Sequence, residues 1–133
     1  MNVISLIKSE MQTVTGIPKI VVPNESYKPV LGTPWIRLSS TEGEPVQITI
    51  GRNRMLRYTG TVQIDLFSVL GTGDNALVDT LKEHFLKFEN RFLGTSDYKV
   101  QIQSIWKGNV VAETNWNRSI LFIRYFYTAP TPA

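Results

Sequence analysis

The chain has 133 residues, of which 42% are hydrophobic and 19% charged, and 14 Lys and Arg residues against 11 Asp and Glu leave a net charge of +3. This length suits a single domain, residues 1–133, with one hydrophobic core, and it excludes a complete dinucleotide-binding domain joined to a substrate domain. The absence of cysteine excludes disulfides, thiol catalysis and cysteine-ligated metals. The mild basic excess is not the dense basic stripe of a dedicated DNA-binding domain.

The N-terminal residues predict a helix. They contain an acidic residue and no small-residue cleavage site, so we expect mature structure here rather than a signal peptide. No apolar run in the chain reaches the roughly 18 residues of a membrane-spanning helix. The helix is predicted to end near Gly16 and Pro18. Its apolar face is formed by residues at helical spacing: Val3, Leu6, Ile7, Met11 and Val14.

Strands dominate the middle of the chain. Residues 19–22 predict a short strand, residues 23–34 an extended connection, and residues 35–40 a second strand. Residues 46–70 predict a β-hairpin around a Gly/Asn/Arg-rich turn. In its second arm, Val62, Ile64 and Leu66 face one way while Thr61, Gln63 and Asp65 face the other. This alternation predicts a half-buried antiparallel strand with its polar residues exposed.

The stretch Gly71-Thr72-Gly73-Asp74-Asn75-Ala76 has the spacing of a dinucleotide-binding turn. That motif requires a buried parallel strand before the glycines and an acid at the end of the next strand. Here the preceding strand alternates, and Asp97 precedes the following strand instead of ending it. We therefore expect a structural turn, in which the two glycines permit positive φ angles, and no cofactor.

A second helix is predicted from Gly73 to about Arg91, with Thr72 or Asp74 as its N-cap. Its apolar face carries Leu77, Leu81, Phe85 and Phe88, flanked by Ala76 and His84. Residues 97–106 and 118–128 predict two further strands, joined by a turn, and Thr128–Ala133 are expected to form a flexible tail. The predicted fold is α+β: a mainly antiparallel sheet with an N-terminal helix and a second helix packed on it, plus the hairpin.

No pattern of catalytic or metal-binding residues is present. His84 is the only histidine and lies on an apolar helix side, so we expect a buried or interface residue rather than a catalytic one. With no cysteine and one histidine, a metal site would depend on carboxylates alone, and no calcium-loop pattern occurs. The chain also has no nucleophile elbow and no phosphate loop. The sequence thus gives no support for an enzyme, a metal or a cofactor.

Two features are candidates for contacts with partners. Arg52, Arg54 and Arg57 cluster in or beside the hairpin turn. They form either a solubilising, edge-protecting loop or a contact loop for an acidic subunit or a nucleic-acid backbone. The last strand is apolar on both faces, so it is either a central strand covered on both sides or a strand buried by another subunit. On the second interpretation, Tyr125 and Tyr127 belong to the interface.

The sequence resembles the tail terminator (tail completion) proteins of long-tailed bacteriophages over about residues 34 to 127. The motifs that carry the resemblance are a strand opening with Pro34-Trp35, the Gly/Arg turn, a strand at residues 58–67, the G-T-G turn with its amphipathic helix, and a closing strand after Trp116. These residues determine the fold more than the role.

The resemblance implies an α+β subunit of a six-membered ring at the head-proximal end of the tail tube in the virion, assembled in the host cytoplasm. Such a ring stops polymerisation of the tube protein and contacts the head-completion proteins, and DNA passes through its lumen without sequence-specific binding. The resemblance brings no catalytic motif, cofactor or membrane contact. A neck (head-completion) protein and a small nucleic-acid-binding module remain as alternatives.

Overall fold

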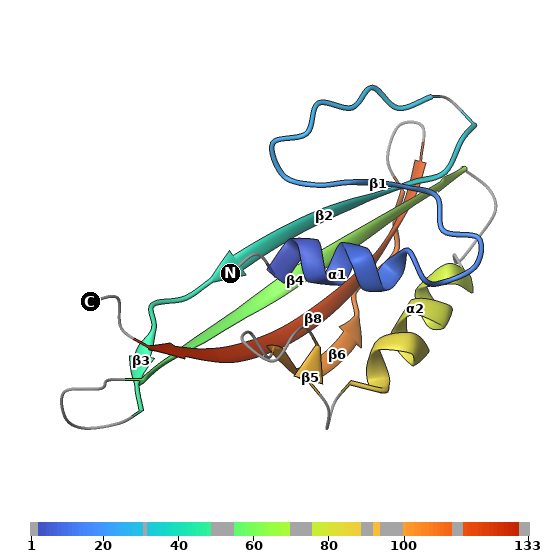
Figure 1. Ribbon diagram of the computed structural model, residues 1–133. Helices are drawn as coiled ribbons and strands as arrows, with labels where there is room; N and C mark the ends of the chain where they lie inside the picture. Colours follow the sequence, from blue (N-terminus) through green and yellow to red (C-terminus); the bar gives the residue numbers. More distant parts are fainter. Residues whose placement is uncertain are drawn as a thin grey trace.

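The computed structural model describes residues 3–30, 32–48, 55–69, 76–88, 92–93, 100–112 and 116–130. Two helices and eight strands occur in this part of the chain (Figure 1). In order they are α1 (Val3–Met11), β1 (Lys19–Val21), β2 (Trp35–Glu42), β3 (Val46–Gln47), β4 (Met55–Val69), α2 (Ala76–Leu86), β5 (Phe92–Leu93), β6 (Val100–Lys107), β7 (Val111–Ala112) and β8 (Trp116–Pro130).

All eight strands belong to one sheet with the order β1-β2-β4-β8-β6-β5. The short strands β3 and β7 pair with β4 and β8, and the parallel pair β1–β2 is the exception in an otherwise antiparallel sheet. The predicted α+β class is therefore confirmed. The longest ladder joins β4 to β8, from Met55 opposite Pro130 to Val69 opposite Trp116.

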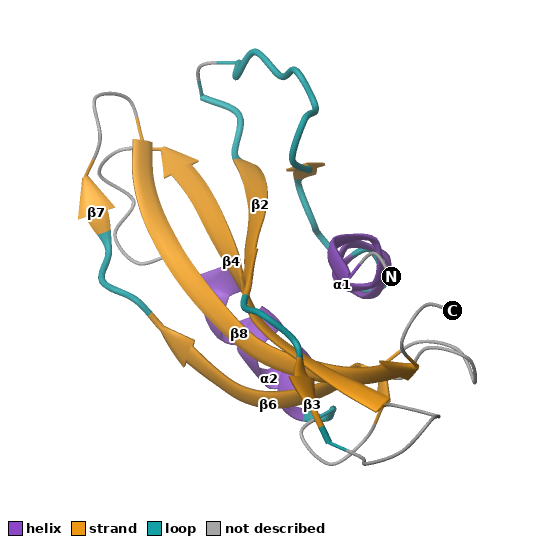
Figure 2. Cartoon of the chain, turned by 90° about the vertical axis from the view of Figure 1, so that its left-hand side faces the viewer, coloured by secondary structure: helices purple, strands orange, loops and turns teal. Residues whose placement is uncertain are grey.

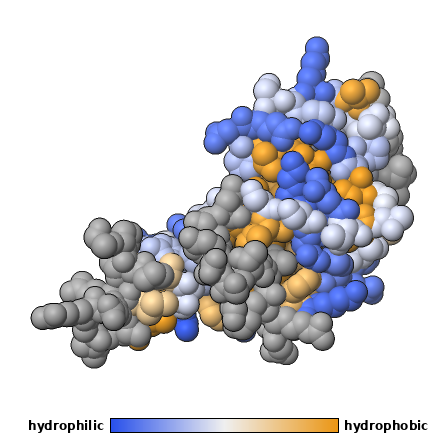
Figure 3. Space-filling model, viewed as in Figure 1, coloured by the Kyte–Doolittle hydropathy of each residue, from blue (hydrophilic) through white to orange (hydrophobic). Residues whose placement is uncertain are grey.

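Both helices pack on the same face of the sheet, because their apolar sides and one set of alternating strand residues form a single core cluster. α1 contributes Val3, Ile4, Ile7 and Met11, and α2 contributes Val78, Leu81 and Phe85. The long strands bend along their length, with α1 on the inner side of the bend (Figure 2). The helix-bearing side mixes hydrophilic and hydrophobic residues on its surface (Figure 3).

The helices are shorter than predicted. α1 ends at Met11 instead of near Gly16, because the backbone bonds that follow are the tighter i→i−3 bonds from Thr13 to Glu10 and from Val14 to Met11. The Thr13 hydroxyl also donates a 2.7 Å hydrogen bond to the Glu10 carbonyl. Gly16 has a φ of +83°, which suits the turn into β1. α2 ends at Leu86, and a tight turn from the Phe85 carbonyl to the Phe88 amide follows. The Gly71–Gly73 turn and both candidate N-caps lie outside the described residues.

Three strands extend beyond their predicted ends. β2 continues to Glu42, β6 continues to Lys107, and β8 begins at Trp116 and continues to Pro130. Residues 128–130 therefore pair with β4 instead of beginning a flexible tail, because Thr128 lies opposite Arg57 and Pro130 opposite Met55. The hairpin is present, and within the described residues its first arm consists of the two residues of β3.

Candidate interaction surface on the helix-free face

The arginines of the three long strands lie together on the face of the sheet that carries no helix. Side chains alternate along β2, β4 and β8, and one set enters the core beneath the helices. The other set includes every arginine of these strands: Arg37, Arg57, Arg118 and Arg124. We call these four residues, with the aromatic side chains of Trp106, Phe122 and Phe126 among them, the arginine face.

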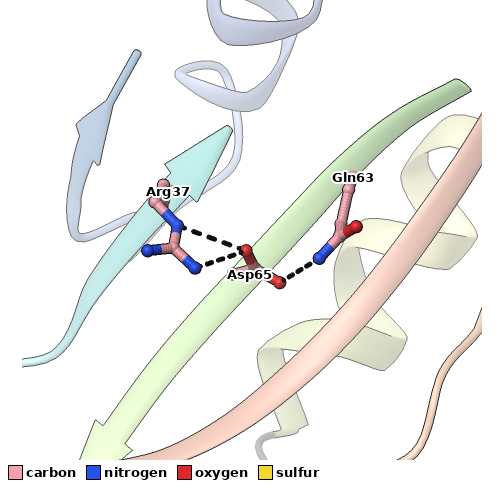
Figure 4. A network of polar contacts seen from close by, with 3 residues as sticks. All are labelled: Arg37, Gln63 and Asp65. Carbon is pink, nitrogen blue, oxygen red and sulfur yellow. Dashed lines mark hydrogen bonds and ion pairs between the residues drawn. The ribbon is translucent and has the colours of Figure 1, made fainter. Parts of the chain in front are cut away.

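Asp65 lies on this face and is buried, with 1% of its surface exposed. Its Oδ2 accepts hydrogen bonds from Arg37 Nε at 3.3 Å and Nη2 at 3.2 Å, and its Oδ1 accepts one from Gln63 Nε2 at 2.9 Å (Figure 4). The prediction that Asp65 is exposed was wrong. A carboxylate can be buried here because Arg37 on the neighbouring strand supplies the opposite charge and two donors.

Aromatic residues cover the end of the helix-free face near Asp65. Trp35 stacks on Phe67 with ring centroids 4.1 Å apart, and Trp116 meets Trp35 edge-on at 6.5 Å. With Val21 they form a second apolar cluster, against which Tyr27 packs. The alternation of polar and apolar residues did not reveal this cluster, because its members come from four separate strands.

The side chains in the middle of the arginine face are partly exposed to solvent. Trp106, 38% exposed, stacks on Phe122 at 5.2 Å, and the Arg124 guanidinium lies 5.8 Å from the Trp106 ring centre. The Arg57 guanidinium lies 4.9 Å from the centre of Phe126. These contacts restrict the arginines while leaving both exposed. β8 is a central strand, as one of the two interpretations of its apolar faces predicted, and the outer of those faces is half-buried.

Tyr125 and Tyr127 occupy the core of the subunit, with exposed fractions of 2% and 7%. The Tyr125 hydroxyl donates a 3.0 Å hydrogen bond to Glu42 Oε1. Burial, and then this hydrogen bond, raises the pKa of Tyr125. Burial, followed by the negative charge of Glu42, raises the pKa of Tyr127 to about 12. An interface role for the two tyrosines stays a prediction. In the single subunit, both side chains are buried in its own core.

His84 links the two helices. Its Nε2 lies 2.7 Å from Glu10 Oε1, and its ring packs edge-on against Phe85. His84 is half-buried between the two helices, which is the packed position expected of a histidine on the apolar side of α2. Within the described ranges, no group of three or more histidine or acidic side chains could hold a metal ion. None of the helices seen there is long and apolar enough to cross a membrane.

Of the three arginines predicted to form a contact loop, the structure places one. Arg57 lies in β4, opposite Val46 of β3 and Thr128 of β8. Arg52 and Arg54 lie outside the described residues, so a joint contact of the three stays a prediction. Arg118 and Arg124 were not among the predicted contact residues, although their alternation with apolar residues in β8 could have indicated them.

A comparison with protein-family models supplies the identity that geometry alone leaves open. The model described as phage tail terminator protein matches residues 2–118. The chain belongs to this family. This match confirms the resemblance inferred from the sequence motifs. Members of a tail terminator family are structural components of the virion tail.

Chains of known structure share the fold of this chain, but the likeness indicates no function. Twelve chains of known structure match this chain. One of them covers 97% of this chain and 97% of its own length with a TM-score of 0.65, at 13% sequence identity. At that identity the likeness concerns the fold alone. No curated protein matches the chain.

Proposed function

We propose that this tail terminator subunit forms a ring, of six copies as the family resemblance implies, that caps the head-proximal end of the tail tube. The ring stops polymerisation of the tube protein and presents a surface to the head-completion proteins. The role is structural, not enzymatic. The observation that carries the proposal is the family match over residues 2–118.

The edges of the sheet support a ring. β1 pairs with only Trp35–Arg37 of β2, and β5 pairs with only Val100 and Gln101 of β6. Within the described residues, the rest of these two strands has no partner on the outer side. A closed ring needs two different patches on each subunit, and open strand edges readily accept another chain. The β2 and β6 edges are candidates for the two patches.

The distal end of the β4–β8 ladder supplies a third contact. There β3, the first residues of β4 and the last residues of β8 extend away from the helices (Figure 1). Val46 and Ile48 are 63% and 44% exposed at this end. We assign to it, with Arg52, Arg54 and Arg57, the contact with a neighbouring subunit or with the tube. DNA then passes through the ring without sequence-specific binding.

Electron microscopy of tails assembled without this gene tests the capping function. Overlong, irregular tubes are expected, because nothing then occupies the growing end. Tails of normal length with unattached heads would contradict capping and would indicate a neck protein instead. Normal infectious particles would contradict both roles. Complementation with the wild-type gene is the control.

A further inference from the structure

The three long strands carry few charged residues besides their four arginines. β2, β4 and β8 contain no lysine, and their only acidic residues are Glu42 and Asp65. Glu42 accepts a hydrogen bond from the core residue Tyr125, and Asp65 is buried against Arg37. On the helix-free face, the three long strands therefore place four arginines and one acidic residue, Asp65, which is paired with Arg37.

The arginines form a row along the β4–β8 ladder. Arg118 and Arg124 are six residues apart in β8, and Arg57 lies opposite Thr128, four residues further on. At about 3.3 Å per residue, the row spans about 33 Å along the strand. The strands bend with α1 on the inner side, so this length follows a curved strand. Arg57 and Arg124 are four ladder positions apart, about 13 Å, and are the pair that one duplex can contact together. An extended row of exposed charge favours a polyanion over a compact acidic patch.

Aromatic rings restrict the side chains of two of these arginines in exposed positions. Arg57 and Arg124 lie over Phe126 and Trp106, and neither forms an ion pair with any residue that the structure describes. Their guanidinium groups are exposed and held by the rings, so contact with a phosphate costs little side-chain entropy. Trp106 is stacked on Phe122, which leaves its ring less available to stack on bases.

We propose that the arginine face binds the phosphate backbone of duplex DNA without reading its sequence. Arg57 and Arg124 make direct phosphate contacts, and the one acidic side chain of the three long strands on this face, Asp65, is paired with Arg37 further along the ladder. The binding surface lies within one subunit, so an unassembled subunit is expected to bind DNA. Arg57 also belongs to the proposed contact of the hairpin end with a neighbouring subunit or the tube, so the single variant R124Q, which lies outside that contact, is measured beside the double variant.

Binding of a duplex of about 30 base pairs by the purified chain tests the proposal, measured by fluorescence anisotropy at several salt concentrations. The double variant R57Q/R124Q is expected to raise the Kd about tenfold or more and to reduce the salt slope by about 2. The matched control is K82Q/K87Q, which removes the same charge from α2 and the turn after it. This control is expected to change the Kd far less.

Four results would overturn the proposal. They are an absence of duplex binding near physiological salt, equal effects of the two double variants, binding unaffected by R57Q/R124Q, and tighter binding of single-stranded DNA of the same length. The last would indicate base stacking instead. If R57Q/R124Q changes the mass of the assembly and not the Kd, the face is a protein interface. Capping is read separately from tail length, so either proposal can fail alone.

Discussion

Gly60 shows how one residue shapes the core around Tyr125. A Cβ at this position would lie 2.5 Å from the Tyr125 hydroxyl oxygen and 2.8 Å from the Thr41 carbonyl oxygen. Gly60→Ala is therefore expected to lower the free energy of unfolding by about 1–3 kcal/mol, since the backbone of β2 must move. Urea unfolding measures the change.

Gly43→Ala is the matched control for this effect. A Cβ there would meet only the Thr59 carbonyl oxygen, at 3.8 Å, which is an ordinary contact. The loss of stability should therefore be much smaller than at Gly60. Equal losses at the two positions would show that close packing against Tyr125 is not what requires glycine.

At the scale of elements, the Arg37–Asp65 ion pair joins β2 to β4, and its two side chains differ in their exposure to solvent. Asp65 is buried, whereas the Arg37 side chain is 46% exposed and can be hydrated when it loses its partner. Arg37→Met leaves a buried carboxylate short of donors and should cost about 1–3 kcal/mol of unfolding free energy. Asp65→Asn should cost less.

Chemical denaturation of both variants measures this order. Arg124→Met is a suitable control, because Arg124 is exposed and forms no ion pair within the described part of the chain. Its effect should stay within about 0.5 kcal/mol. A greater loss for Asp65→Asn than for Arg37→Met would contradict the view that Arg37 serves chiefly to neutralise Asp65.

At the scale of the whole molecule, assembly should be separable from folding. Replacing Arg52, Arg54 and Arg57 together by Glu is expected to leave the fold intact and to abolish ring assembly or tube capping, because the charge at the hairpin is reversed. Circular dichroism checks the fold, and tail length in the electron microscope checks capping. Normal assembly and capping by the triple variant would remove these arginines from the proposed interface.

Local patterns were sufficient to predict most of the fold. Helical spacing identified α1 and α2, and period-2 alternation identified β4 with Val62, Ile64 and Leu66 in the core. The ends of elements were less predictable, since the change to i→i−3 bonds after Met11 and the full length of the β4–β8 ladder do not follow from the spacing of apolar residues. The candidate site was predicted only at Arg57, because strand pairing decides which arginines share a face.

The sequence by itself determined the class of fold, the order of elements and the resemblance to tail terminators, because these depend on spacing along the chain. Only the tertiary structure decided which side chains meet. Asp65 is buried because Arg37, 28 positions earlier, lies on the adjacent strand, and Tyr125 reaches Glu42 across 83 positions. Such contacts depend on strand register, and register brings distant residues to one face of the sheet.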